Sequence, residues 1–271
     1  MPFTSHQIVM KLVGTIHVDL EGPRRLEHLL QLHKPGVVTV ECPRNLSIDE
    51  TVNLFLARRA VSAEVLESTE MPAFLRDYYK EYFSILGYEI VVAAEYAREE
   101  GAQIYPVDHP DIAKLMSFEV GKEALIKELK EVADAALLQL AQSQIDASKI
   151  TYAQARPGIV KQIDMTYFDP DLFKKLVGSM DITRKQTENM LIRLSEQQRR
   201  IFSDPAFGEE REQSMANAVL ERNPDMNIGG VAHILEGPTE ALNVVPLYAR
   251  LGNKVTERIR LCDAFKTSAT Q

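Results

Sequence analysis

Two histidines follow a glycine at the same short spacing, each where an apolar run meets a polar segment. One stands in GTIH, from Gly14 to His17, and the other in GVAH, from Gly230 to His233. A glycine near a strand end lets another backbone approach closely, and a neutral imidazole is a common metal ligand. Two imidazoles presented from two strand ends could begin a transition-metal site. The alternative is a pair of loop histidines that hydrogen-bond to nearby backbone.

Two carboxylates also end apolar runs. Glu41 directly follows the run VVTV, and Asp108 ends the run in YPVDHP. A carboxylate is costly to bury unless it is paired, protonated or bound to a cation. Glu41 is therefore a candidate third metal ligand or general base, unless its side chain turns to solvent. Asp108 has a plainer alternative, since aspartate commonly caps turns.

Two charged residues fall on the apolar stripes of predicted helices. Glu89 shares a helix face with Val92, and Arg211 shares one with Met215. Glu89 could complement a helix N-terminus, and the Arg211 stem could lie along apolar neighbours. The functional alternative is that both line a cleft. Arg211 would then stabilise an oxyanion, and Glu89 or Asp108 would orient a metal-binding histidine.

The elements that must position these residues alternate between strand and helix signals. Strand signals run through QIVMKLVGTI, GVVTVEC, GAQIYPVD, MNIGGVAHI and KVTERIRL, and helix signals through EGPRRLEHLLQLH, YEIVVAAEYAREE, DPAFGEEREQSMANAVLER and GPTEALNVVPLYARLG. In such units ligands collect at the carboxyl ends of the strands. Both histidine motifs continue into Glu-Gly-Pro and a further strand, which indicates a weak internal repeat. We therefore expect an α/β fold with a mixed sheet built from two related βαβ-type halves, with the two histidines at equivalent strand ends.

The middle of the chain has a different pattern. Apolar residues recur at helical spacing between residues 125 and 140, and DPDLFKKLV at residues 169–177 begins another predicted helix. We expect an N-terminal α/β half over residues 1–110, a helical insertion over 111–204 and a C-terminal α/β half over 205–271. All three would form one compact domain.

Composition limits the partners. A formal net charge of −8 argues against nucleic acid or an anionic membrane as the main partner. No leader pattern and no run of about 18 apolar residues occurs, so we expect a cytoplasmic protein with no membrane partner. Cys42 and Cys262 lie far apart with no Cys-x-x-Cys pair, which indicates reduced thiols and no thiolate zinc site. A homo-oligomer is compatible with this composition.

Several short motifs together resemble the TraB/PrgY and Tiki superfamily, to which GumN-like proteins are related. The motifs are GTIHV, the Glu-Cys pair after the second strand, GYE, GAQIYPVDHP, REQSM and GGVAHILEG. The resemblance implies a metal-dependent, protease-like site at the paired Gly-x-x-His motifs, and it matches Glu41 to the glutamate between them. Glu89, Asp108 and Arg211 match other recurrent polar positions. More remote relatives bind haem or hydrolyse ester bonds.

The sequence thus predicts a metal-dependent hydrolase that acts on peptides. His17 and His233 would bind the metal with Glu41 as ligand or base, and donors without thiolate suit manganese, cobalt or zinc. Two alternatives stay open. One is a metal-free hydrolase in which His17 is the general base and Glu41 orients it. The other is a protein that binds a peptide or haem without chemistry.

Overall fold

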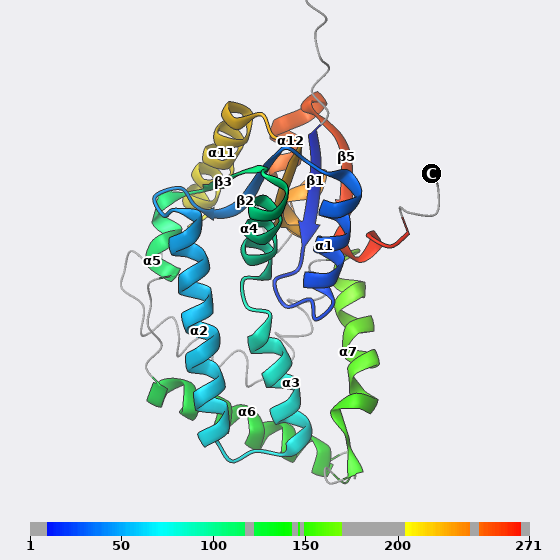
Figure 1. The fold of residues 1–271 in the computed structure, drawn as a ribbon. Coiled ribbons are helices and arrows are strands. Elements are labelled where there is room, and N and C mark those ends of the chain that lie inside the picture. The colour runs from blue at the N-terminus through cyan, green and yellow to red at the C-terminus, as the bar shows by residue number, and fades with distance from the viewer. Residues whose placement is uncertain are drawn as a thin grey trace, which may run out of the picture.

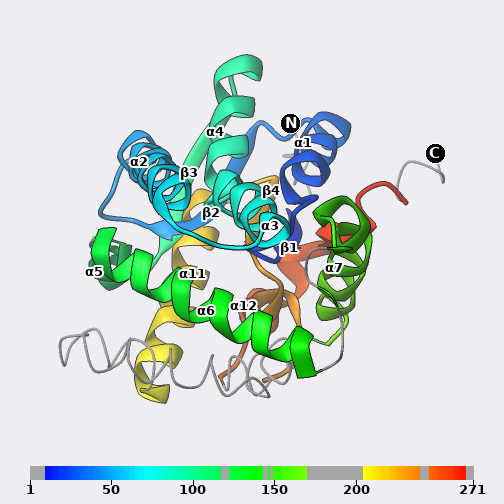
Figure 2. The same ribbon diagram turned by 90° about the horizontal axis from the view of Figure 1, so that it is seen from below.

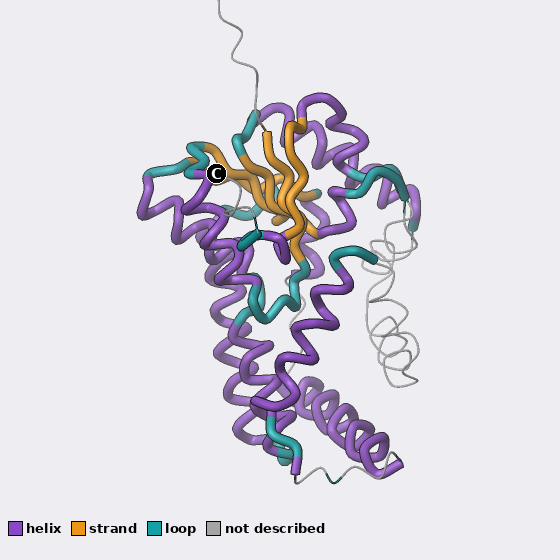
Figure 3. The backbone as a smooth tube through the Cα atoms, turned by 90° about the vertical axis from the view of Figure 1, so that its right-hand side faces the viewer, coloured by secondary structure: helices purple, strands orange, loops and turns teal. Residues whose placement is uncertain are grey.

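The computed structural model describes residues 10–116, 122–142, 146, 149–169, 204–238 and 244–266. Its strands gather at one end of the molecule, and several long helices extend away from them (Figure 1; Figure 3). No helix in these ranges is both long enough and apolar enough to cross a membrane.

Five strands form one sheet in the order β3-β2-β4-β1-β5. The strands are β1 (Met10–Thr15), β2 (Val37–Pro43), β3 (Gln103–Asp108), β4 (Met226–Gly230) and β5 (Val255–Arg260). The predicted α/β class is confirmed. The expectation of a mixed sheet is corrected, because every strand pair in the described residues is parallel. Helical segments separate successive strands along the chain, and such crossovers let neighbouring strands run in one direction.

The two predicted halves interleave within this sheet. β4 lies between β1 and β2, and β1 lies between β4 and β5. In the register of β1 with β4, Gly14 stands opposite Gly229. The carboxyl ends that lead to the two histidines are therefore side by side, with the motif glycines Gly14 and Gly230 offset by one position. The domain boundaries after residues 110 and 204 stay a prediction.

Helices cover both faces of the sheet (Figure 2). On one face lie α1 (Gly22–His33) and α4 (Tyr88–Glu100), which pack against each other. α4 is followed by Gly101, whose φ of 73° is the left-handed conformation that commonly ends a helix. On the other face lie α11 (Pro205–Arg222) and α12 (Leu247–Leu251).

The remaining helices form a layer beyond the carboxyl edge of the sheet. They are α2 (Ile48–Ser68), α3 (Ala73–Ser84), α5 (Ala113–Met116), α6 (Lys122–Gln142) and α7 (Tyr152–Thr166). α2 and α3 were not predicted, although the Ser47 and Glu50 capping box at the start of α2 is a readable helix signal. α6 packs on α2, and α7 packs on α3. The layer therefore includes residues 48–84 as well as part of the predicted insertion.

Short 3₁₀ turns follow three of the strands. They are η1 (Pro110–Ile112) after β3, η3 (Val231–Ile234) after β4 and η5 (Leu261–Asp263) after β5, and η4 (Gly252–Lys254) precedes β5. The helix predicted at residues 169–177 lies outside the described residues from residue 170 onward. Of the helix predicted over residues 237–252, only the portion from Leu247 is seen as a helix, and residues 239–243 are not described.

Candidate functional site

Four neighbouring strands carry polar residues at their carboxyl ends. Asp108 ends β3, Glu41 lies near the end of β2, His233 lies in η3 directly after β4, and His17 follows β1. Since all four strands are parallel, these ends meet at one edge of the sheet, where ligands of α/β proteins usually bind. The structure thus brings together residues more than two hundred positions apart in the chain.

Glu41 is the centre of this row, and its side chain is only 10% exposed. One carboxylate oxygen, Oε1, accepts a hydrogen bond from Nη2 of Arg211 at 2.5 Å and lies 3.2 Å from Nε2 of His233. The other, Oε2, accepts from the backbone N–H of Gly230 at 2.5 Å. Burial would raise the pKa of this carboxyl, but His233 and Arg211 hold it well below its ordinary value. Glu41 is therefore ionised and paired.

Arg211 joins Glu41 to Asp108. Its Nε and Nη2 atoms donate to the two carboxylate oxygens of Asp108, each at 2.7 Å. Such a bidentate pair fixes geometry as well as charge. Asp108 also accepts from the backbone N–H of His109 at 2.7 Å, so its turn-capping role and its ion pair coexist. Arg211 therefore points inward, as its position on the apolar face of the helix predicts, and its guanidinium is paired with the carboxylates of Asp108 and Glu41.

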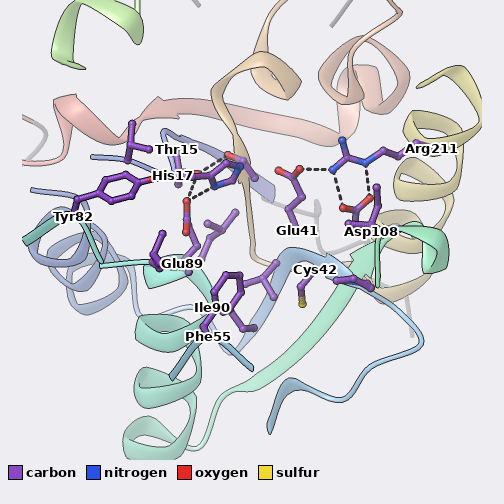
Figure 4. Close-up of a pocket in the computed structure, with 18 residues that line it drawn as sticks. Thr15, His17, Glu41, Cys42, Phe55, Tyr82, Glu89, Ile90, Asp108 and Arg211 are labelled. Carbon is purple, nitrogen blue, oxygen red and sulfur yellow. Dashed lines mark hydrogen bonds and ion pairs between the residues drawn. The ribbon is translucent and has the colours of Figure 1, made fainter. Parts of the chain in front are cut away.

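His17 is held by Glu89 from the first turn of α4. Nδ1 of His17 lies 2.6 Å from Oε1 of Glu89, and the Thr15 hydroxyl donates to the same oxygen at 3.1 Å. The Glu89 carboxylate raises the pKa of His17 to about 9, although partial desolvation of the ring opposes this. Figure 4 shows His17 and Glu89 facing each other at one side of the cavity. This is the position expected of a carboxylate that orients a histidine.

His233 has a matching partner that the sequence analysis missed. Nδ1 of His233 lies 2.7 Å from Oε1 of Glu212, in an ion pair whose geometry departs from that of a hydrogen bond. Both side chains are almost fully buried. Burial would lower the pKa of His233, but Glu41 and Glu212 raise it to about 10. The sequence contained a signal that Glu212 is buried, because it lies at helical spacing from the apolar residues Met215 and Val219, which are buried in the structure.

The two imidazoles therefore share one arrangement. Each turns Nδ1 toward a glutamate, and Nε2 of His233 also lies 3.2 Å from Oε1 of Glu41. Histidines that bind metal ions characteristically direct their other ring nitrogen to a carboxylate. The nitrogen and oxygen donors suit manganese, cobalt or zinc. Burial raises the pKa of the nearby Cys42 thiol, which disfavours the thiolate that a metal would need.

The donors fit a metal ion in kind but are not gathered around one point. Among the side chains that the structure describes, no three from His, Cys, Asp and Glu are grouped closely enough to hold a metal ion. Both oxygens of Glu41 already accept hydrogen bonds, from Arg211 and from the backbone N–H of Gly230.

Two glycines allow the close approach of these strand ends. A Cβ on Gly14 would lie 2.6 Å from Cδ1 of Ile234, which is closer than side chains tolerate. A Cβ on Gly229 would lie 3.2 Å from Oε2 of Glu41. Glycine at these positions lets η3 pack on β1 and lets Glu41 reach the backbone of β4.

A cavity of about 480 Å³ opens beside this row, where the carboxyl edge of the sheet meets the helical layer. Its volume is within the range of small-ligand sites. Its polar wall consists of Thr15, His17, Glu41, Glu89, Asp108 and Arg211 (Figure 4).

No protein-family model, no curated protein and no solved structure matches this chain. The resemblance to the TraB/PrgY and Tiki superfamily stays a prediction.

Proposed function

We propose that this protein is a metal-dependent hydrolase that acts on peptides, with His17, His233 and Glu41 as ligands of manganese, cobalt or zinc. The observation that carries the proposal is the matched support of both imidazoles. Glu89 contacts Nδ1 of His17 and Glu212 contacts Nδ1 of His233, at 2.6 and 2.7 Å. Two unrelated loop histidines would have no reason to share this support.

The residues around the proposed ligands have separate tasks. A bound divalent ion supplies Lewis acidity, which makes water a usable nucleophile near neutral pH. With a metal bound, Glu89 and Glu212 would face the protonated Nδ1 of each ring, and Nε2 would lose its proton to become the ligand. Arg211 places a permanent positive charge beside the cavity, where it can stabilise negative charge that develops on a peptide carbonyl oxygen.

The two roles considered for Glu41 are not equally supported. A general base works best when its pKa lies near the operating pH. The contacts with His233 and Arg211 hold the pKa of Glu41 well below its ordinary value. This supports a ligand, which must be ionised, more than a base.

The test is metal content together with turnover. Purified protein is loaded with manganese, cobalt or zinc, measured by elemental analysis and assayed on a peptide library before and after chelation. We expect about one ion per chain, turnover that chelation removes and metal addition restores, and loss of both in His17→Ala and His233→Ala. Wild-type protein that takes up no stoichiometric metal would contradict the proposal.

A metal-free hydrolase is the second candidate, because the carboxylate of Glu41 is already paired with Arg211 and His233. Peptide turnover that persists in chelator would identify it. A pKa of about 9 for His17 counts against that residue as a base at neutral pH. A protein that binds peptide or haem without turnover is the remaining alternative, and the same library and a haem titration identify it.

A further inference from the structure

The cavity has an apolar side that the proposed metal chemistry does not use. Figure 4 shows Tyr82, Phe55 and Ile90 on the side of the cavity away from Asp108 and Arg211. Leu86 and Val18 are also among the lining residues. An apolar wall in contact with water has a free-energy cost that a bound apolar group removes.

This wall is fixed by a close backbone contact. Gly87 has a φ of 65°, and a Cβ at this position would lie 2.2 Å from Cγ of Phe55. Only glycine lets the backbone lie against the ring in this way. One turn along α2, Nε of Arg59 donates to the carbonyl oxygen of Leu86 at 2.9 Å. α2 and the turn before α4 are therefore held together at Phe55 and at Arg59.

The same short segment connects the wall to the polar row. Gly87 precedes α4 directly, and Glu89 in the first turn of α4 contacts Nδ1 of His17. A substrate group that packs on Phe55 and Leu86 therefore lies beside the bond presented to His17. A volume of about 480 Å³ accommodates a peptide unit with a large side chain.

Resting on the proposed function, we infer that the substrate is a peptide whose cleaved bond adjoins a residue with an aromatic or branched aliphatic side chain. Phe55, Leu86 and Ile90 bind this side chain. An acidic side chain in its place would lose its hydration and face the carboxylates of Glu41 and Glu89. A small polar side chain would leave the wall uncovered.

The kinetic test uses peptides that differ only at the residue next to the cleaved bond. We expect kcat/KM for phenylalanine or leucine to exceed that for serine by roughly 10–200-fold, the range for apolar side chains in apolar sites. Phe55→Ala should reduce this ratio about tenfold. Leu56→Ala is the matched control, because Leu56 is the next residue of α2 and is 43% exposed. It should leave the ratio unchanged.

Phe55→Leu is a second variant, which controls for a possible folding defect in Phe55→Ala. It retains apolar volume and should keep the preference for leucine over serine while lowering that for phenylalanine. Thermal melting of each variant shows whether the fold is retained.

A binding experiment separates this inference from the proposed function. N-acetyl-phenylalanine amide and N-acetyl-serine amide are titrated into metal-loaded and chelator-treated protein by calorimetry. We expect only the phenylalanine amide to bind, in both forms, and Phe55→Ala to weaken it about tenfold. Binding without any peptide turnover would sustain the apolar site and reject the hydrolase. Turnover with no preference between phenylalanine and serine, unchanged in Phe55→Ala, would overturn the inference and leave the hydrolase standing.

Discussion

The two histidines share the same Nδ1 support but differ in exposure. The side chain of His17 is 63% exposed, whereas that of His233 is 5% exposed. In the proposed site, His233 would therefore be the buried ligand and His17 the ligand exposed to a substrate. The carboxylate behind each histidine is a separate target for mutation.

Glu212 is expected to act through His233 alone. Glu212→Gln keeps the volume of this buried side chain and removes its charge, so we expect metal affinity to fall roughly 10–100-fold, as for other carboxylates that support metal-binding histidines. Metal titration with a competing chelator measures this. Glu221→Gln is the control, since Glu221 is an exposed residue of the same helix. Equal affinities in the two variants would remove Glu212 from the site.

Arg211 supports a buried carboxylate as well as lining the cavity. Lysine cannot reproduce its bidentate contact with Asp108, so Arg211→Lys should lower the free energy of unfolding by about 1–3 kcal/mol, the cost of an unpaired buried polar group. Urea denaturation measures the change. Unchanged stability together with a 10²–10³-fold loss of kcat would instead assign Arg211 to oxyanion stabilisation alone.

The metal-free protein should show a pH dependence to which His17 contributes, together with His233, whose pKa is raised to about 10. Glu89 raises the pKa of the His17 imidazole from 6.5 to about 9. A raised pKa means that the stabilising charge of His17 is fully present below pH 6.5 and is lost as the pH rises through about 9. The melting temperature of chelator-treated wild type should therefore fall over this interval, and that of Glu89→Gln should fall less. An NMR titration that finds the His17 pKa near 6.5 in the wild type would contradict this.

At the scale of elements, the loop after β1 is anchored by two tyrosine hydroxyls. Tyr88 donates to the carbonyl oxygen of Ile16 at 3.2 Å. Tyr167 accepts from the backbone N–H of Ile16 at 3.3 Å and donates to Oδ2 of Asp19 at 2.8 Å. Tyr167 directly follows α7, and Asp19 is fully buried. The helical layer thus helps to position the loop that carries His17.

Arg25 reinforces this link between α1 and α7. Its Nη1 atom donates to Oδ2 of Asp19 at 2.9 Å and to Oδ1 of Asp164 at 2.7 Å. Nη2 of Arg25 donates to the second oxygen of Asp164 at 3.1 Å. Asp164 belongs to α7, so the loop, α1 and α7 form one network of charges.

Tyr167→Phe tests this anchoring. The change keeps the ring but leaves Asp19 and the Ile16 N–H each without one partner, so the free energy of unfolding should fall by about 1–3 kcal/mol. Amide exchange at Ile16 should also become faster. Tyr105→Phe is the control, because the Tyr105 hydroxyl bonds only to the exposed Gln103 in the part of the chain that is described. Slow exchange at Ile16 in Tyr167→Phe would show that the loop does not depend on α7.

At the scale of the whole molecule, the site depends on both ends of the chain. β4 pairs with β1 on one side and with β2 on the other, and it leads to His233. β1 and β2 are the first two strands along the chain, but they do not pair with each other in the described sheet. The site therefore exists only when the C-terminal segment inserts between them.

A fragment of residues 1–204 should accordingly lack the site. Without β4, the strands β1 and β2 lose their shared neighbour, so we expect no cooperative unfolding and no stoichiometric metal binding. Circular dichroism during urea denaturation and elemental analysis measure the two properties. Adding a fragment of residues 205–271 should restore both in part. A fragment 1–204 that unfolds cooperatively and binds metal at wild-type level would contradict the interleaved sheet.

Local sequence patterns were enough to predict several elements and the strand ends. Strand and helix signals predicted α1, α4, β3 and α11, because hydrophobic spacing acts over a few neighbouring positions. The same patterns placed His17, Glu41 and Asp108 at strand ends. The capping box at Ser47 is also a local signal. The start of α2 could therefore be predicted from the sequence, although it was not.

Only the tertiary structure decided the strand order and the partners of the charged residues. The hydrogen bond from Gly230 to Glu41 joins residues 189 positions apart, and that from Arg211 to Asp108 joins residues 103 apart. Helix periodicity placed Arg211 toward the core but could not say which carboxylate it would meet. Such contacts depend on the insertion of β4 between β1 and β2. That order is set by the packing of the whole core, which no short stretch of sequence contains.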